Sequence, residues 1–482
     1  MTDLLKILEN DARLSPETIA LMLDKEVGDI KKMIDEYERE GVILGYRTEI
    51  DWDKTDREYV SAMIELKITP QRDRGYDHVA QKIYNYPEVE SLFLMSGSFD
   101  LAGFIKGKTM REVAFFVAEK LATIEDVISL TVGQPDFITP WHIRVAAIES
   151  LENGKTYYTS NAGTMELRTE ISDYMHRRFS LSYDPKDEII VTVGGSEAID
   201  LCIRTLVNPG DEVIIPQPSF VCYGPITSLA GGVPVYVETK EEDNFKLTPE
   251  ELKNAITPKT KLLVLPFPNN PTGAIMTRED LEKIAEVLRG TDVMVLSDEI
   301  YCELTYGREH VSIASLDGMR ERCVVASGFS KTYAMTGWRL GYTLAPREVT
   351  KQMLKVHQYA IMCAPTSSQY AAVEAMRNGD PDVDMMRSEY NRRRRYIVAG
   401  LRGIGFECFD PEGAFYAYPN VSRYGLSSED FARRLLDEAG VAVVPGTAFG
   451  DCGEGFVRIS YAYSVEHIAK ALDRIEKFVN NL

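Results

Sequence analysis

The sequence predicts an α/β protein: a mainly parallel sheet with helices on both faces, preceded by two smaller domains. After about residue 129, apolar runs of strand length (KLLVLPFP, DVMVLSDEIY, RCVVASGF) alternate with amphipathic helical patterns such as REDLEKIAEVLRG. Runs without polar alternation are typical of parallel strands that are buried on both faces. Polar residues follow directly after these runs, where open α/β sheets place their ligands.

The first region, residues 1–52, is predicted to be helical. The run LLKIL gives a helical apolar stripe, and a second helix starts at SPETIALML with Ser15 as N-cap and Pro16 at the first helical position. A third helix covers DIKKMIDEYERE and ends at Gly41, and VILGYRTEI reads as a strand. Three short helices and a strand suggest a winged helix-turn-helix.

The second region, residues 56–130, alternates strands and helices. YVSAMIELKI, SLFLMSG and LAGFIKG read as strands, and YDHVAQKIYNY and MREVAFFVAEKLATI read as helices. This βαββα order implies a small ferredoxin-like domain, and we expect a closing strand near DVISLTV.

Composition excludes several classes of function. The chain has 482 residues, 44% of them hydrophobic, and a net charge of −20, which opposes non-specific binding to nucleic acid. Seven cysteines without a CxxC pair fit a reducing cytoplasm. The six histidines show no metal-ligand spacing, so we expect no metal site. We also find neither a signal-peptide pattern nor a stretch that predicts a membrane span.

Eight ordered motifs identify the third region, residues 129–482. They are VGQPDF (132–137), YYTSNAG (157–163), VTVGGSEAI (191–199), QPSF (217–220), PNNPTG (268–273), SDEIY (297–301), GFSKTYAMTGWRLGY (328–342) and VRISYA (457–462). In this order they resemble the class I/II aminotransferases, which are pyridoxal 5'-phosphate (PLP) enzymes of fold type I. The resemblance implies a large cofactor-binding part at about 160–365, and a small part that combines about 366–482 with 129–155.

Lys331 is the candidate reactive residue. Taken alone, a lysine at this position is an exposed side chain at the corner after a strand. A PLP enzyme needs a neutral amine that forms a Schiff base with the cofactor aldehyde, and lysine is the side chain for that reaction. The resemblance places Lys331 in this role and in carrying the proton between substrate Cα and cofactor C4′.

The cofactor phosphate requires cations and backbone N–H groups. Arg339 is suited to bidentate binding, and Gly195 and Ser196 start a helix whose N-terminus attracts anions. The position where many family members carry a phosphate-binding serine is Gly328 here, so we assign that role to Ser330. Tyr158 matches a family tyrosine that reaches the phosphate of the neighbouring subunit, which implies a homodimer.

The remaining assignments concern the cofactor ring and the substrate. The resemblance gives Asp298 the role of keeping the pyridine nitrogen protonated, and has Tyr301 and Asn270 bind the phenolic oxygen while Phe220 stacks on the ring. Arg458 matches the arginine that binds the substrate α-carboxylate, and Gly133 matches a loop glycine beside that carboxylate. Each has a structural alternative: an N-cap aspartate, an Asn-Pro turn, a core aromatic residue, or a solvated arginine.

Residues 1–130 resemble transcription regulators of the Lrp/AsnC type, and GSFD at 97–100 looks like the effector-loop motif of that family. Residues 1–50 carry 12 acidic against 7 basic residues, whereas DNA binding requires a local basic cluster. DNA binding through this region therefore stays open.

The stretch EDVISLTVGQPDF must end the second region and begin the third. The arm that family aminotransferases carry before this loop is absent, and we interpret the junction as a fusion of two units.

The leading hypothesis is an aminotransferase that moves an amino group from an amino acid to a 2-oxo acid. The alternatives are an amino-acid-responsive transcription regulator with a PLP-binding sensor domain, and a PLP-dependent lyase on the same fold.

Overall fold

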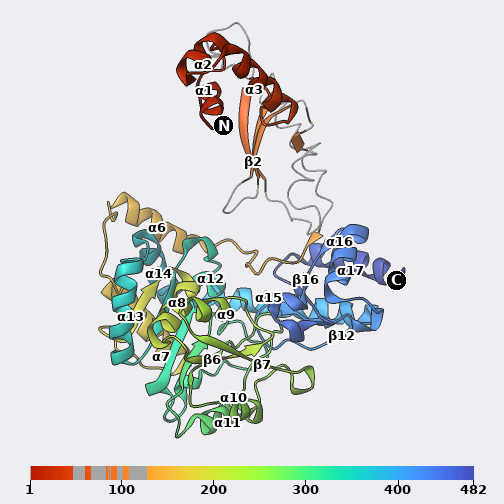
Figure 1. Ribbon diagram of the computed structural model, residues 1–482. Helices are drawn as coiled ribbons and strands as arrows, with labels where there is room; N and C mark the ends of the chain where they lie inside the picture. The colour runs from red at the N-terminus through yellow and green to blue at the C-terminus, as the bar shows by residue number, and fades with distance from the viewer. Residues whose placement is uncertain are drawn as a thin grey trace. The chain divides into compact units, whose positions relative to one another are not determined.

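The computed structural model describes residues 2–46, 60–66, 83–84, 86, 88–94, 101–107 and 128–482. The chain divides into two compact units, Met1–Ile124 and Glu125–Leu482. Each unit is described separately below (Figure 1).

The N-terminal unit begins with three helices, α1 (Thr2–Asn10), α2 (Pro16–Leu23) and α3 (Val27–Arg39). Ser15 caps α2 by accepting the Thr18 backbone N–H at 3.1 Å, as predicted. The helices share a small apolar core formed by Leu4, Ile19, Ala20, Ile30 and Tyr37. The strand predicted from VILGYRTEI is wrong for residues 42–46, which form no strand, and its remaining residues lie outside the described part.

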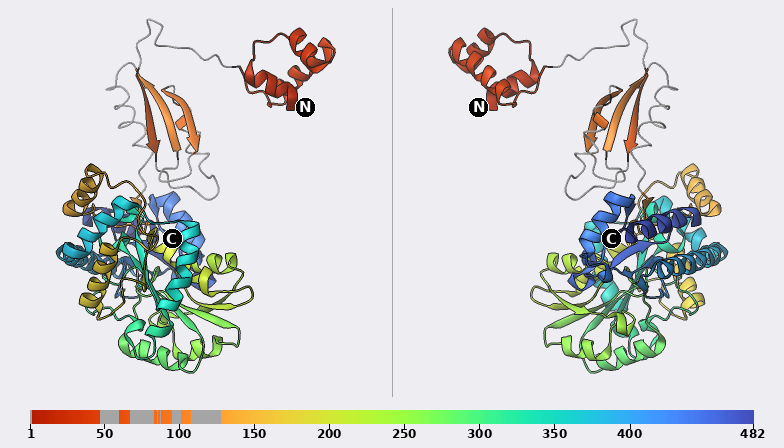
Figure 2. Two further views of the ribbon diagram at one scale, coloured as in Figure 1. Left: turned by 90° about the vertical axis from the view of Figure 1, so that its left-hand side faces the viewer. Right: turned by 90° about the vertical axis from the view of Figure 1, so that its right-hand side faces the viewer.

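A three-stranded sheet follows, made of β1 (Val60–Leu66), β2 (Val89–Leu94) and β3 (Leu101–Gly107). Both neighbouring pairs are antiparallel, and the order β1-β3-β2 places the last described strand in the middle (Figure 2). The three strands of the predicted βαββα order are present. The two helices predicted in this region fall almost entirely outside the described residues.

The prediction that a strand near DVISLTV closes this domain is wrong. Ile128–Ser129 forms β4, which pairs in parallel with β15 (Val441–Ala442) of the C-terminal unit instead of joining the three-stranded sheet. Backbone N–H groups of Ile128 and Leu130 donate to carbonyl groups of Gly440 and Ala442. A short apolar strand carries no signal that specifies its partner, so the tertiary structure decided the pairing.

The C-terminal unit is built around a seven-stranded sheet. Its strands are β5 (Ile189–Thr192), β6 (Glu212–Gln217), β7 (Val233–Glu238), β8 (Thr260–Leu265), β9 (Met294–Asp298), β10 (Cys323–Gly328) and β11 (Gly341–Leu344). The order is β5-β11-β10-β9-β8-β6-β7, and only β11 runs antiparallel to its neighbours. The predicted mainly parallel sheet is thus confirmed.

Helices cover both faces of this sheet (Figure 2). They are α6 (Trp141–Glu152), α7 (Met165–Phe179), α8 (Gly194–Leu206), α9 (Tyr223–Leu229), α10 (Pro249–Ala255), α11 (Arg278–Leu288), α12 (Phe329–Thr332), α13 (Arg347–Ala360) and α14 (Thr366–Asn378). Alternate strand residues enter opposite cores: Leu263 and Leu265 pack with α7, α11 and α14, whereas Leu262 and Val264 pack with α8 and α13.

The C-terminal part of this unit has its own core beside the large sheet (blue in Figure 1). It contains α15 (Asp380–Ile404), α16 (Ser428–Ala439) and α17 (Val465–Val479), with β12 (Glu407–Cys408), β13 (Tyr416–Ala417), β14 (Pro419–Asn420), β16 (Val444–Pro445) and β17 (Val457–Ser460). The small sheet β13-β17-β16 carries residues toward the site described next. None of the helices in the described residues is long and apolar enough to cross a membrane.

Candidate active site

A cavity of about 390 Å³ lies at the carboxyl ends of the central strands. Eleven of the residues singled out in the sequence line it: Gly133, Gly195, Ser196, Phe220, Asn270, Asp298, Tyr301, Ser330, Lys331, Arg339 and Arg458. Parallel strands end at the same edge of a sheet, so residues that are distant in the sequence converge there. Tyr158 does not line the cavity; its side chain is 77% exposed on the surface of its own chain.

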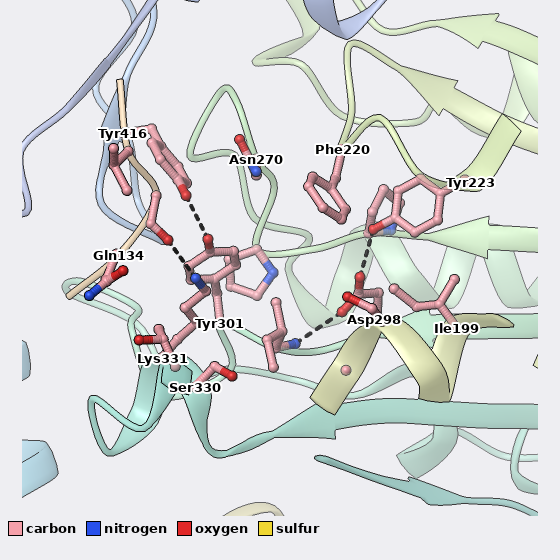
Figure 3. Close-up of a pocket in the computed structure, with 18 of the residues that line it drawn as sticks. Gln134, Ile199, Phe220, Tyr223, Asn270, Asp298, Tyr301, Ser330, Lys331 and Tyr416 are labelled. Carbon is pink, nitrogen blue, oxygen red and sulfur yellow. Dashed lines mark hydrogen bonds between the residues drawn. The ribbon is translucent and has the colours of Figure 1, made fainter. Parts of the chain in front are cut away.

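Lys331 projects into this cavity from α12, the single turn that follows β10 (Figure 3). Its Nζ donates a hydrogen bond to the backbone oxygen of Gly133 at 2.5 Å. Burial, and after it the nearby charges of Arg458 and Arg339, together lower the pKa of Lys331 to about 8. The neutral, nucleophilic form of this amine is therefore more populated near neutral pH than in an ordinary lysine.

Asp298 ends β9 and is 7% exposed. One carboxylate oxygen accepts the Tyr223 hydroxyl at 2.6 Å, and the other accepts the Ile300 backbone N–H at 3.2 Å. Burial raises the pKa of Asp298 to about 6, although these two hydrogen bonds favour the ionised form. Within the described part of the chain no lysine or arginine is paired with it, so its charge is available to a cationic group in the cavity.

Tyr301 meets a residue that the sequence analysis missed. Its hydroxyl lies 2.7 Å from the hydroxyl of Tyr416, on β13, and the two rings point toward each other (Figure 3). A Cβ atom on Gly133 would lie 2.2 Å from the Tyr416 hydroxyl, so glycine is required there. The motif GAFYAY contains Tyr416, but no local pattern connects it to Tyr301. Tyr223, three residues after QPSF, was missed for the same reason.

The N-terminus of α8 forms the second end of the cavity. Gly194 has φ +76°, and a Cβ atom there would lie 2.6 Å from a terminal nitrogen of Arg339. The guanidinium of Arg339 therefore lies against the first turn of α8, where Gly195 and Ser196 line the cavity. Free backbone N–H groups, the positive end of the helix dipole and a guanidinium together favour an anion.

Arg458 lies on β17 and is 7% exposed. It donates to the side-chain oxygen of Asn270 at 2.8 Å and to the backbone oxygen of Thr131 at 2.5 Å. The rings of Tyr416 and Phe449 lie 4.5 and 4.8 Å from its guanidinium carbon. The buried Nε has no hydrogen-bond partner in the structure, so the hydrogen bonds of this guanidinium are not all satisfied within the chain.

The cavity residues fit the cofactor that the sequence resemblance implies. PLP carries an aldehyde, a pyridine nitrogen and a phosphate group, and the cavity supplies an amine with a lowered pKa, an unpaired carboxylate and an anion cradle. The close contact between Gly194 and Arg339 shapes this cradle, which a side chain at residue 194 would fill. Among the residues that the structure describes, no cluster of His, Cys, Asp and Glu could hold a metal ion.

Comparison with known families gives two matches. The family Aminotransferase class I and II matches residues 125–475, and the Lrp/AsnC ligand binding domain matches residues 61–132. Residues 125–132 belong to both matches. The second match confirms the expected resemblance to that regulator family for the ligand-binding domain at residues 61–132; β4, within the shared stretch, is part of the C-terminal unit.

Known proteins and structures agree with the first match. YugH of Bacillus subtilis, an aminotransferase by name, is 54% identical over 74% of this chain and 93% of its own length. The aspartate aminotransferase of Pyrococcus abyssi is 46% identical over 74% of this chain and 92% of its own. The crystal structure of an aromatic aminotransferase from Pyrococcus horikoshii has a TM-score of 0.73 and 44% identity, covering 76% of this chain and 99% of that one.

A family match across most of the chain, relatives covered nearly end to end and a cavity that fits the cofactor lead to one conclusion. The chain belongs to the class I and II aminotransferases and is a PLP-dependent enzyme that transfers amino groups between amino acids and 2-oxo acids.

Proposed function

We propose that Lys331 is the residue that attaches the cofactor and that the cavity around it is the catalytic site. The supporting observation is its amine, whose pKa is lowered to about 8 in the same cavity as Asp298, Arg339 and Arg458. These four groups supply the nucleophile, a counter-charge and two anion sites that amino transfer requires. PLP, when bound, supplies an electron sink for the bonds at substrate Cα.

The cofactor is held at both ends in this proposal. Arg339, Gly195, Ser196 and Ser330 bind its phosphate through a guanidinium, backbone N–H groups and hydroxyl groups. At the other end Asp298, oriented by its hydrogen bonds, keeps a proton on the pyridine nitrogen.

Tyr301, Asn270 and Phe220 all line the cavity. In this proposal Tyr301 and Asn270 would bind the phenolic oxygen, and Phe220 would pack on the ring. The Tyr301–Tyr416 hydrogen bond fixes the orientation of the Tyr301 hydroxyl.

Two groups act on the substrate. Arg458 binds the α-carboxylate, with its guanidinium held in place by Asn270 and Thr131, while Gly133 brings its backbone beside it. Lys331 Nζ would act as the base that takes the proton from substrate Cα, which requires the neutral amine. Its hydrogen bond to the Gly133 oxygen orients the amine toward the same region.

The substrate side chain is proposed to be apolar. The cations that line the cavity in the described residues are Lys331, Arg339 and Arg458, and each already has a role. A second carboxylate on an acidic donor would find no further cation there, whereas Val132, Ile300 and Tyr416 offer apolar and aromatic contacts. Relatives include both aspartate and aromatic aminotransferases, so the family alone does not decide this choice.

An absorbance experiment tests the proposal. We expect the purified full-length chain to bind PLP with a visible band that is lost on adding phenylalanine, and less readily on adding aspartate, and then restored by a 2-oxo acid. Lys331→Ala should lose the covalent band and at least about 10²-fold in activity, since proton transfer alone contributes that much. Lys355→Ala, at a surface lysine of α13, is the matched control. An unchanged band in Lys331→Ala would exclude Lys331.

The two alternative functions have less support. In the N-terminal helices Lys31 pairs with Glu17 at 3.3 Å and Arg39 pairs with Glu36 at 3.6 Å, which reduces the positive charge offered to DNA. Gel-shift measurements on the full chain, with and without amino acids, test the regulator hypothesis. A lyase would release ammonia, which an enzymatic ammonia assay distinguishes from transfer.

We also propose a homodimer. Apolar side chains are exposed on α6 and the segment after it: Trp141, Ile148, Leu151, Tyr157 and Tyr158. A partner copy would cover this surface and use Tyr158 for its phosphate site. Light scattering of the purified chain measures the stoichiometry.

All seven cysteines lie in the continuously described range 128–482 and are free thiols, which supports a reducing compartment such as the cytoplasm.

A further inference from the structure

A glutamate just beyond the cavity connects the start of α8 to another helix. Glu197, on the first turn of α8, accepts the backbone N–H of Val193 with one carboxylate oxygen. Its other oxygen lies 2.6 Å from Nδ1 of His357 on α13. A carboxylate only accepts hydrogen bonds, so the His357 nitrogen is the donor. The glutamate is thereby fixed at both oxygens.

Both side chains are shielded from solvent. The His357 side chain is fully buried and that of Glu197 is 12% exposed. Neither residue lines the cavity, so neither touches what binds there. A buried carboxylate is costly unless it is paired and hydrogen-bonded, so this arrangement is stable only as a unit.

The hydrogen bond between Glu197 and Val193 concerns the backbone N–H groups at the start of α8. The first N–H groups of a helix have no partner within the helix. Val193 is the N-cap residue of α8 and lacks a side-chain cap of its own. Glu197 satisfies the N–H of Val193 from within the helix. The next residues, Gly194, Gly195 and Ser196, begin the helix, so their N–H groups have no partner inside it.

The His357 contact has an electrostatic consequence. Glu197 directly follows Ser196, so its negative charge stands close to the proposed phosphate site and opposes an anion there. The imidazole donates a hydrogen bond to this carboxylate from α13 and so satisfies its second oxygen.

We propose that Glu197 and His357 are positioning residues for the phosphate end of the cofactor site. They act through the backbone of Val193–Ser196, by orienting its N–H groups, and never contact the cofactor. This inference rests on the proposed role of Gly195 and Ser196 in holding the phosphate.

The test compares two ligands of the purified apoprotein: PLP, and pyridoxal, which lacks the phosphate. Dissociation constants are measured by absorbance titration. Glu197→Ala and His357→Leu, the latter keeping the site filled, should weaken PLP binding about 10-fold, the size of a helix-cap effect, and change pyridoxal binding less than about twofold. Glu197→Gln and His357→Asn keep an acceptor for Val193 and a donor for Glu197, and should restore most of the PLP affinity.

His142→Leu is the matched control. His142 bonds Glu374 at 2.7 Å and Asp382 at 2.9 Å in a similar bridge between helices, but lies outside the cavity lining. It should leave the ratio of the two dissociation constants unchanged.

The outcomes distinguish a failure of the positioning role from a failure of the proposed phosphate site. Equal weakening of PLP and pyridoxal, or no change in either, in the Glu197 and His357 variants would overturn the positioning role. Ser196→Ala tests the phosphate site itself. If it shifts the ratio while the Glu197 and His357 variants do not, the phosphate site stands and the inference fails. If none of the three shifts the ratio, the phosphate assignment fails as well.

Discussion

Two walls of the cavity are built in different ways. The sheet wall consists of Asp298, Tyr301 and Lys331. They lie at the end of β9 or shortly after the adjacent parallel strands β9 and β10. The C-terminal wall, Gly133, Tyr416 and Arg458, combines the entry loop with β13 and β17 of the small sheet. Arg458 donates a hydrogen bond to the backbone oxygen of Thr131, in the loop that also carries Gly133. The two residues are 327 positions apart in the sequence.

The difference also appears in how each wall is supported. Asp298 is fixed from within the large sheet part, by Tyr223 and the Ile300 backbone. Arg458, by contrast, depends on a loop oxygen and on Asn270. We infer that the sheet wall serves the chemical step and the C-terminal wall serves substrate recognition. Substitutions in the two walls should therefore affect different kinetic constants.

The largest effect is expected at the sheet wall. Asp298→Asn keeps the shape of the side chain and removes its charge, and with it the counter-ion that we propose for the ring nitrogen. We expect kcat to fall about 10²-fold, comparable to removal of another fixed electrostatic group, with KM for the amino donor changed less than about threefold. Steady-state kinetics measure both constants. A fall confined to KM would contradict the division between the walls.

The C-terminal wall should respond the other way. Arg458→Gln removes charge-assisted hydrogen bonds to the α-carboxylate, each worth about 1.5–3 kcal/mol, and should raise KM for the amino donor at least about 10-fold. Arg339→Gln is the control, because it should weaken cofactor binding with a smaller effect on KM.

Arg458→Gln also changes the titration of Lys331. Arg458 is the larger of the two charge effects that lower the Lys331 pKa below its usual value. Loss of this positive charge favours the ammonium form, so the pKa should rise above about 8 and less neutral amine should be present at pH 7. The pH at which PLP attaches at half its maximal rate should then move upward, and a downward shift would contradict the cause we assign.

The sequence predicted the sheet wall better than the C-terminal wall, for a physical reason. Asp298 and Lys331 follow apolar runs that β9 and β10 reproduce, and a strand end followed by polar residues is a local signal. Tyr223 and Tyr416 reach their partners across 75 and 115 residues, and no local periodicity encodes such a pair. They require the tertiary structure.

The same distinction explains the error at the junction. DVIS has the pattern of a strand, and Ile128–Ser129 is one, but strand propensity does not choose between two sheets. The parallel register with Val441–Ala442 decided its partner. In the first region, the apolar residues after Gly41 resemble a strand, yet residues 42–46 have no strand hydrogen bonds.

The smallest expected effect lies where the two walls meet, at the hydroxyl pair of Tyr301 and Tyr416, 2.7 Å apart. Tyr416→Phe removes one hydroxyl without removing a charge, and a neutral hydrogen bond contributes about 0.5–1.5 kcal/mol. We expect kcat/KM to fall about two- to tenfold, with cofactor affinity nearly unchanged.

Because the two hydroxyl groups share this contact, the effects of Tyr301→Phe and Tyr416→Phe should be non-additive, with a coupling energy of about 1 kcal/mol in a double-mutant cycle. Strict additivity would mean that Tyr416 acts only through its packing against Gly133 and Arg458, and that the walls are energetically independent at this point.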